Sequence, residues 1–206
     1  MEMYNADGSR GAMCGNGIRC VGKYVYDRKL TRKTCLTIDT DAGPRGLELA
    51  VRGGKVEQVT VDMGQAILYP EVELEAMGEQ YTVHQVGVGN PHAVIFCPDP
   101  EGVRLEELGP VLECHPNLRE RSNVEFVSCQ DGHDLRVRVW ERGSGITLAC
   151  GTGACAAFEA ARQQGLCGSR AEARLPGGTL GLEWREGRIF MTGPARTVFE
   201  GEIEMG

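Results

Sequence analysis

Apolar residues recur at helical spacing in two stretches of the chain, and each stretch directly follows a glycine-rich turn. After residue 14, Ile18, Val21 and Val25 alternate with charged positions, which is typical of an amphipathic helix. After residue 150, alanines and Phe158 dominate positions 154–161, as in a helix that lies deep in a core. The pattern therefore predicts one amphipathic helix and one buried helix.

Each predicted helix is followed by two segments in which apolar and polar residues alternate. A glycine-containing turn separates the two segments, Gly53-Gly54 in the first case and Glu186-Gly187 in the second. Alternation around such a turn is typical of a β-hairpin. The predicted strand pairs are 47–51 with 56–63, and 180–184 with 188–192.

The two turns that precede the helices share the pattern Cys-Gly-polar-Gly. They lie at 14–17 and 150–153, so a unit of cysteine, helix and hairpin occurs twice in the same order. We interpret this recurrence as an internal duplication. The predicted fold class is α+β, with two pseudo-symmetric halves at 1–78 and 79–206.

The two halves are unequal upstream of their cysteines. Strands are expected at 81–88, 93–97, 123–129 and 135–140 before the second turn, whereas thirteen residues precede the first turn. If the halves are equivalent, the first half is incomplete and lacks its opening strands. We therefore expect this chain to be an N-terminally truncated version of a longer protein, with exposed sheet edges and with its own activity left open.

Composition narrows the class of protein. The chain has 206 residues, of which 41% are hydrophobic and 25% charged, as in an ordinary globular protein. Its formal net charge of −7 argues against a general nucleic-acid binder. No apolar run is long enough to span a membrane, and the N-terminus does not resemble a signal peptide. Nine cysteines without an export signal indicate a cytoplasmic protein with free thiols.

The repeated turn places a cysteine at the start of a helix. The first backbone N–H groups of a helix have no intrahelical partner, and together with the helix dipole they stabilise the thiolate form of a cysteine there. Two such thiols on opposite sides of one substrate would suit racemisation, in which one removes a Cα proton and the other supplies one. The sequence leaves open which thiol is ionised at rest.

Other roles for the cysteines are less consistent with the spacing. The remaining seven are expected to be small buried hydrophobes: Cys20, Cys35, Cys97, Cys114, Cys129, Cys155 and Cys167. Zinc binding is disfavoured because Cys14/Cys20 and Cys150/Cys155 do not form the matched C-x₂₋₄-C pairs of zinc knuckles. A thioredoxin-like redox site is disfavoured because there is no C-x-x-C.

Four motifs resemble those of the diaminopimelate epimerase family. They occur in order along the whole chain, at 5–9 with 13–20, at 89–93, at 123–126, and at 140–143 with 147–153. The resemblance implies two halves, each with a curved, mostly antiparallel sheet wrapped around a central helix, and a site between them. It further implies interconversion of LL- and meso-diaminopimelate without pyridoxal phosphate or metal, on the route to lysine and cell-wall precursor, by a homodimer.

The resemblance also implies roles for individual residues. Cys14 and Cys150 correspond to the acid/base thiols. Glu141 and His92 correspond to residues close to the thiols that could take a thiol proton, and Glu141 also counts as substrate-binding. The groups expected to hold the α-carboxylate are Gly15, Asn16, Gly151 and Thr152, and those expected to hold the distal end of the substrate are Asn5, Asn90, Asn123 and Arg142.

Three alternatives remain open. A proline or hydroxyproline racemase of the same superfamily would also use two cysteines, but it would not need the distal set that contains Arg142. Phenazine-biosynthesis isomerases resemble this fold but do not use the cysteine pair, so the presence of both thiols here disfavours them. An inactive fragment or binding module is the third alternative, because the opening strands are missing.

Overall fold

Both predicted helices form, and each begins immediately after its cysteine. The computed structural model describes residues 1–4, 8, 10–11, 13–202 and 204, and in it α1 spans Gly15–Asp27 and α3 spans Gly151–Gln163. The buried character expected of the second helix is confirmed, since ten residues of α3 are buried. α1 buries a single face, with Ile18 fully buried and Tyr24 58% exposed.

The two predicted hairpins are confirmed. β4 (Arg45–Arg52) pairs antiparallel with β5 (Lys55–Gly64), and β14 (Gly178–Arg185) pairs antiparallel with β15 (Arg188–Pro194). The four strands expected before the second turn also form, as β8 (Glu79–Gly87), β9 (Pro91–Phe96), β10 (Asn123–Gln130) and β11 (Asp134–Glu141).

Several elements had no counterpart in the sequence prediction. α2 (Leu105–Glu113) is the longest of them, and it contains Gly109 and Pro110 and has no side-chain cap at its start. Such a segment has weak local helix signals, and packing against the sheet decides its state. The others are β1 (Met3–Tyr4), β2 (Arg10–Gly11), β3 (Cys35–Ile38), β6 (Ile67–Leu68), β7 (Val72–Ala76), the 3₁₀ helix η1 (Pro100–Gly102), β12 (Gly145–Thr147) and β13 (Arg170–Leu175).

One thirteen-stranded sheet contains both hairpins and joins the two parts of the chain. Its order is β3-β4-β5-β15-β14-β13-β11-β10-β9-β8-β6, with β12 paired to β11 and β7 paired to β8. The connection across the middle is the antiparallel pair β5–β15, so the first hairpin continues directly into the second. The sheet is mostly antiparallel, and its parallel pairs are β9–β10 and β11–β13.

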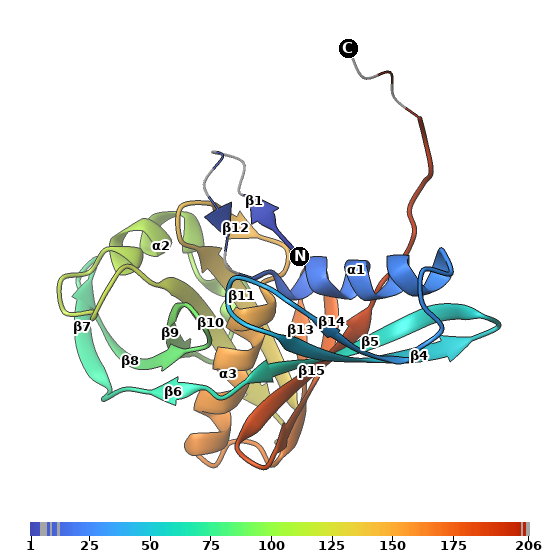
Figure 1. Cartoon of the computed structure of the whole chain (residues 1–206). Coiled ribbons are helices and arrows are strands. Elements are labelled where there is room, and N and C mark those ends of the chain that lie inside the picture. The colour runs from blue at the N-terminus through green and yellow to red at the C-terminus, as the bar shows by residue number, and fades with distance from the viewer. Residues whose placement is uncertain (5–7, 9, 12, 203, 205–206) are drawn as a thin grey trace.

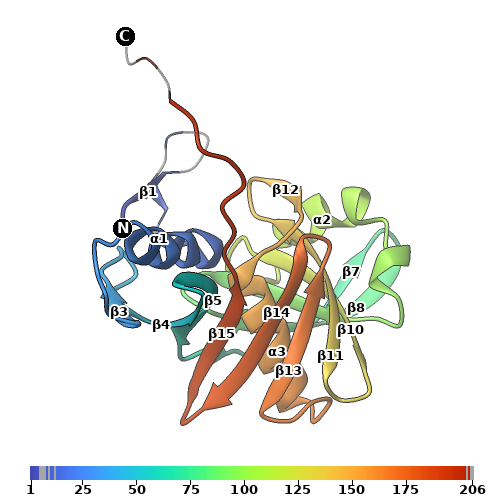
Figure 2. The ribbon, with the colours of Figure 1, turned by 90° about the vertical axis from the view of Figure 1, so that its right-hand side faces the viewer.

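The sheet curls around α3 (Figures 1 and 2), where the main hydrophobic core lies. α1 packs on β4 and β5 through its small residues, because a Cβ on Gly22 would lie 2.8 Å from a Leu47 methyl group. α2 covers the other face of β10 and β11 and forms a second core with β7. The α+β class with a curved, mostly antiparallel sheet around a central helix is therefore confirmed, although the two parts of the chain share one continuous sheet.

The boundary expected between residues 78 and 79 falls in the tight turn that joins β7 to β8. Met77 and Gly78 both have positive φ there, as a two-residue hairpin turn requires. The division of the chain into 1–78 and 79–206 stays a prediction. No helix in the described part of the chain is long and apolar enough to cross a membrane.

Candidate active site

The N-termini of α1 and α3 meet at their first glycines. A Cβ added to Gly151 would lie 3.5 Å from the Cα of Gly15, and one added to Gly15 would lie 3.6 Å from the Cα of Gly151. Both positions also face the thioether of Met191 on β15, at 2.8 Å from the Gly15 Cβ position. Glycine at both positions lets the two backbones approach this closely. The duplicated turns, which are distant in sequence, therefore form one site.

Each cysteine caps the helix that it precedes. Cys14 Sγ accepts a hydrogen bond from the N–H of Gly17, and Cys150 Sγ accepts one from the N–H of Gly153, both at 3.3 Å. Both cysteines have extended backbone angles, as residues at the N-cap position do. Backbone N–H groups that would otherwise lack partners are thus directed at sulfur.

A cavity of about 640 Å³ lies between the two helix ends and is lined by both cysteines. Ten of the residues predicted for the site line it: Cys14, Gly15, Asn16, Asn90, Asn123, Glu141, Arg142, Cys150, Gly151 and Thr152. Asn5, also predicted for the site, lies outside the described residues. The structure therefore brings together most of the predicted set, and the role of each residue stays a prediction.

His92 is placed behind the cavity wall instead of among its lining residues. Its side chain is fully buried, with Nδ1 at 2.7 Å from Glu125 Oε1 and Nε2 at 2.9 Å from Asn90 Oδ1. Both ring nitrogens are therefore occupied within the protein, and His92 orients the amide of Asn90. Its predicted proton exchange with a thiol would need these contacts to change.

The distal part of the cavity is built around Asn123 at the start of β10. Its amide accepts a hydrogen bond from the N–H of Arg142 at 2.9 Å and donates one to the carbonyl of Pro91 at 3.1 Å. Glu141 accepts a hydrogen bond from the hydroxyl of Thr147 at 2.6 Å. Asn123 thereby holds together the segments that carry Asn90 and Arg142.

Two cations in the cavity wall were not among the residues predicted from the sequence. Arg10 on β2 and Arg45 on β4 line it together with Arg142, whereas Glu141 is the carboxylate among the lining residues. The Nε of Arg45 is buried and has no hydrogen-bond partner among the residues that the structure describes. Arg10 is paired with Glu2 and Asp41, so Arg45 and Arg142 supply the positive charge of the wall, which suits an anionic ligand although the chain as a whole is acidic. Neither Arg10 nor Arg45 belongs to a motif, so no local signal marks them.

The surroundings of Cys150 oppose its ionisation. Burial raises the pKa of the Cys150 thiol to about 12, and the charges of Glu125 and Glu141 act in the same direction. The Thr152 hydroxyl at 3.4 Å and the N–H of Gly153 stabilise the thiolate, but they do not offset this effect. At Cys150 the helix start therefore favours the thiolate, as expected, but burial outweighs this effect and keeps the pKa of the thiol high.

The turn that presents Arg142 is fastened by the buried carboxylate of Glu113, at the end of α2. Glu113 accepts hydrogen bonds from Trp140 Nε1 at 2.7 Å and from the N–H of Gly143 at 3.3 Å, and it pairs with Arg121. Burial alone would raise the pKa of Glu113, but the hydrogen bonds from Trp140 and Arg121 hold it below its ordinary value. The ionised carboxylate is therefore the form that this turn requires.

We expect protonation of Glu113 to weaken the fold at acid pH. Because its pKa is lower in the folded chain, Glu113 contributes stability above its unfolded pKa of about 4.3, and this contribution is lost as pH falls through the folded value. Glu113→Gln should reduce the free energy of unfolding by roughly 1–3 kcal/mol at neutral pH. Urea unfolding of both chains at several acid pH values measures this, and a constant difference between them would contradict it.

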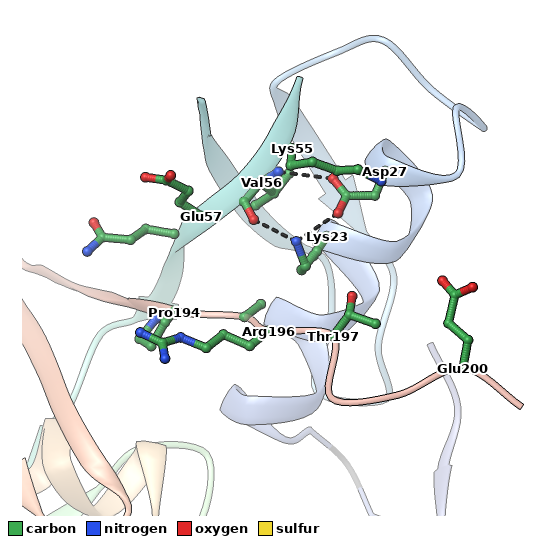
Figure 3. A pocket seen from close by; sticks show the side chains of 11 residues that line it. Lys23, Asp27, Lys55, Val56, Glu57, Pro194, Arg196, Thr197 and Glu200 are labelled. Carbon is green, nitrogen blue, oxygen red and sulfur yellow. Dashed lines mark hydrogen bonds and ion pairs between the residues drawn. The ribbon is translucent and has the colours of Figure 1, made fainter. Parts of the chain in front are cut away.

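A second cavity, of about 790 Å³, lies between α1, β5 and the segment 194–200 (Figure 3). Its polar groups largely satisfy one another. Lys23 Nζ lies 2.7 Å from both Asp27 Oδ2 and the carbonyl of Val56, and Asp27 accepts the N–H of Val56 at 2.9 Å. These bonds fasten α1 to β5, so we assign this cluster a structural role.

Known proteins resemble this chain over its whole length. A sequence model described as "Diaminopimelate epimerase" matches residues 1–69 and 84–198. The diaminopimelate epimerase of Leptospira biflexa is 48% identical over 221 residues, which cover 100% of this chain and 79% of that protein. The diaminopimelate epimerase of Bacteroides thetaiotaomicron is 50% identical over 208 residues, which cover 99% and 77% respectively.

A solved structure shows a similar fold. The crystal structure described as a probable proline racemase from Agrobacterium radiobacter superimposes with a TM-score of 0.80, covering 100% of this chain and 71% of that one at 16% identity. Identity this low supports a common fold, and the assignment of a family depends on the sequence matches. The chain therefore belongs to the diaminopimelate epimerase family of isomerases.

Proposed function

We propose that this chain interconverts LL- and meso-diaminopimelate by a two-cysteine acid/base mechanism, in the biosynthesis of lysine and cell-wall precursor. One thiolate removes the Cα proton from one face of the substrate, and the opposite thiol returns a proton to the other face. The roles of the thiols exchange in the reverse reaction. The observation that carries the proposal is the meeting of the two helix ends at Gly15 and Gly151, which places both cysteines in the wall of one cavity.

The helix ends also suit the charge that develops during the reaction. Removal of a Cα proton transfers negative charge to the α-carboxylate, which needs donors that are already in place. The N–H groups at Gly15, Asn16, Gly151 and Thr152 lie at the starts of α1 and α3, where backbone donors lack helical partners. We assign the α-carboxylate to this end of the cavity.

The other end of the cavity suits the second amino-carboxylate of diaminopimelate. Arg142 can bind a carboxylate through two parallel hydrogen bonds, and Asn90 and Asn123 provide amide groups beside it. A proline-type racemase has no need for this set, because its substrate has no distal charged group. We therefore favour diaminopimelate, and we expect a cytoplasmic enzyme that acts as a homodimer without a cofactor.

The proposal is tested by incubating the reduced chain with LL-diaminopimelate in D₂O without pyridoxal phosphate. We expect deuterium at the Cα, followed by ¹H NMR, together with formation of the meso epimer followed by chiral chromatography. L-Proline and trans-4-hydroxy-L-proline serve as matched controls, and neither should exchange. A folded, reduced chain that exchanges none of these substrates would refute the proposed activity, whereas exchange of proline alone would identify the racemase.

A further inference from the structure

The face of the first hairpin that supports α1 continues beyond the start of that helix. On β4, Leu47 and Leu49 are buried, and the residues between and beside them are exposed, as in a strand with one face in the core. Arg45 lies two residues before Leu47, so its side chain belongs to the same inner face. The apolar face of β4 therefore ends in a cation.

The contacts of α1 show at which end of the helix Arg45 lies. In the middle of α1, a Cβ on Gly22 would lie 2.8 Å from a methyl group of Leu47. At the end of α1, the carboxylate of its last residue accepts the N–H of Val56, which pairs with Val51 of β4 (Figure 3). β4 therefore runs in the same direction as α1, and Arg45, which precedes Leu47, lies toward the start of the helix.

The cavity of the candidate active site reaches this position. Arg45 lines it together with Cys14, Gly15 and Asn16, which form the start of α1. The Nη1 atom of Arg45 lies beside the end of β5, where a Cβ on Gly64 would be 3.9 Å from it. The guanidinium and the backbone donors at the start of α1 therefore face one space.

Arg45 differs from the other two arginines of the cavity in its hydrogen bonds. Arg10 Nη2 donates to Asp41 at 2.9 Å, and Arg142 Nη1 donates to the carbonyl of Arg121 at 3.1 Å. The Nε of Arg45 is buried and has no acceptor within the described part of the chain. A buried donor without an acceptor is costly, and an acceptor that arrives with a ligand removes this cost.

The carboxylates on the segments next to Arg45 are paired with other cations. Asp41, four residues earlier in the chain, pairs with Arg10. Asp62, on the neighbouring strand β5, pairs with Arg188 at 2.8 Å. Because these carboxylates are already engaged, the positive charge of Arg45 remains available to an anion that enters the cavity.

We infer that Arg45 contacts the substrate and binds its α-carboxylate, so that a formal positive charge supplements the neutral N–H groups at the start of α1. The inference rests on the proposed function, in which the α-carboxylate occupies this end of the cavity and Arg142 binds the distal carboxylate. The electron pair left by the departing Cα proton increases the negative charge on the α-carboxylate. Arg45 therefore stabilises the transition state more than the bound substrate.

Equilibrium binding of two ligands tests which carboxylate Arg45 holds. Meso-diaminopimelate has both ends, whereas L-2-aminoheptanoate has the same carbon chain and α-amino acid group but no distal charged groups. Isothermal titration calorimetry should show that Arg45→Gln weakens the binding of both ligands by a similar factor, roughly 10- to 100-fold. Arg142→Gln should weaken the binding of diaminopimelate alone. Loss of affinity for diaminopimelate alone in Arg45→Gln would overturn the assignment to the α-carboxylate, and unchanged affinity for both ligands would refute the contact.

Turnover gives a second measurement of the same assignment. Arg45→Gln should lower kcat for diaminopimelate by roughly 10- to 100-fold, because it removes a charge that acts on the transition state. Arg142→Gln should mainly raise KM, because the distal end does not change charge during the reaction. An undiminished kcat in Arg45→Gln would contradict the inference even if the parent chain binds L-2-aminoheptanoate too weakly to measure.

Two further variants separate charge from structure. Arg45→Lys keeps a cation at this position and should lose less affinity than Arg45→Gln. Arg52→Gln alters an exposed arginine at the other end of β4 and should match the parent chain. If Arg45→Gln does not fold, the Nε–H signal of Arg45 in ¹⁵N NMR, assigned by its absence from Arg45→Lys, decides: it should shift when meso-diaminopimelate is added, and an unmoved signal at saturation would refute the contact.

The same preparations distinguish this inference from the proposed function. Epimerisation of diaminopimelate by Arg45→Gln at the parent kcat and KM would overturn the role of Arg45 alone. Binding of both ligands that depends on Arg45, in a chain that exchanges no Cα hydrogen, would overturn the proposed function and leave the carboxylate contact established.

Discussion

Replacement of either cavity cysteine by serine is expected to lower the rate of diaminopimelate epimerisation by roughly 10²- to 10⁴-fold. Serine retains an acceptor for the N–H of Gly17 or Gly153, so the helix cap is preserved. Its hydroxyl is, however, too weak an acid to exchange a proton with Cα at neutral pH. Cys14→Ser and Cys150→Ser should therefore keep the fold and lose the reaction, as measured by chiral chromatography of the products.

Deuterium incorporation in the two serine variants should show which face of the substrate each thiol serves. With one thiol removed, the remaining thiol can still exchange the Cα hydrogen that faces it, so slow deuterium incorporation without inversion is expected for one epimer. Cys35→Ser is the matched control and should epimerise at the parent rate, because this cysteine of β3 is exposed, contrary to the expectation from the sequence. Epimerisation at an undiminished rate in either cavity variant would exclude the two-thiol mechanism.

Gly109→Ala is expected to produce a large loss of stability, because α2 packs directly on an aromatic ring at this position. A Cβ on Gly109 would lie 2.4 Å from Cδ2 of Trp140 and 2.6 Å from Cγ and Cε3 of the same ring. The ring cannot simply rotate away, because its Nε1 donates to Glu113 at 2.7 Å. Either α2 moves off the sheet or the buried hydrogen bond breaks, and overpacking of this kind costs about 1–3 kcal/mol.

Gly109→Ala should also disturb the candidate active site, because Trp140 directly precedes Glu141 and Arg142. We expect a melting temperature lower by roughly 2–10 °C, measured by circular dichroism, and a raised KM for diaminopimelate. Gly168→Ala is the matched control, because a Cβ there meets nothing within 4 Å. Equal melting temperatures for the two variants would show that α2 and Trp140 adjust without strain.

Local features explain what could be predicted about the fold. Apolar spacing and glycine turns are properties of a few neighbouring residues, and they correctly located α1, α3 and both hairpins. α2 was missed because Gly109 and Pro110 weaken its local helix signal. The short strands β6 and β12 were missed because two or three residues are too few to show an alternation of apolar and polar positions. These segments become strands because they pair with β8 and β11.

The sequence by itself determined the duplicated cysteine turns and, through four ordered motifs, most of the residues that line the cavity. It could not distinguish Cys14 from Cys150, because the two turns are alike along the chain. That difference comes from the deeper burial of Cys150 and from Glu125, which β10 places beneath α3. Burial and charge act through space, so only the tertiary structure shows that the ionisation of Cys150 is opposed.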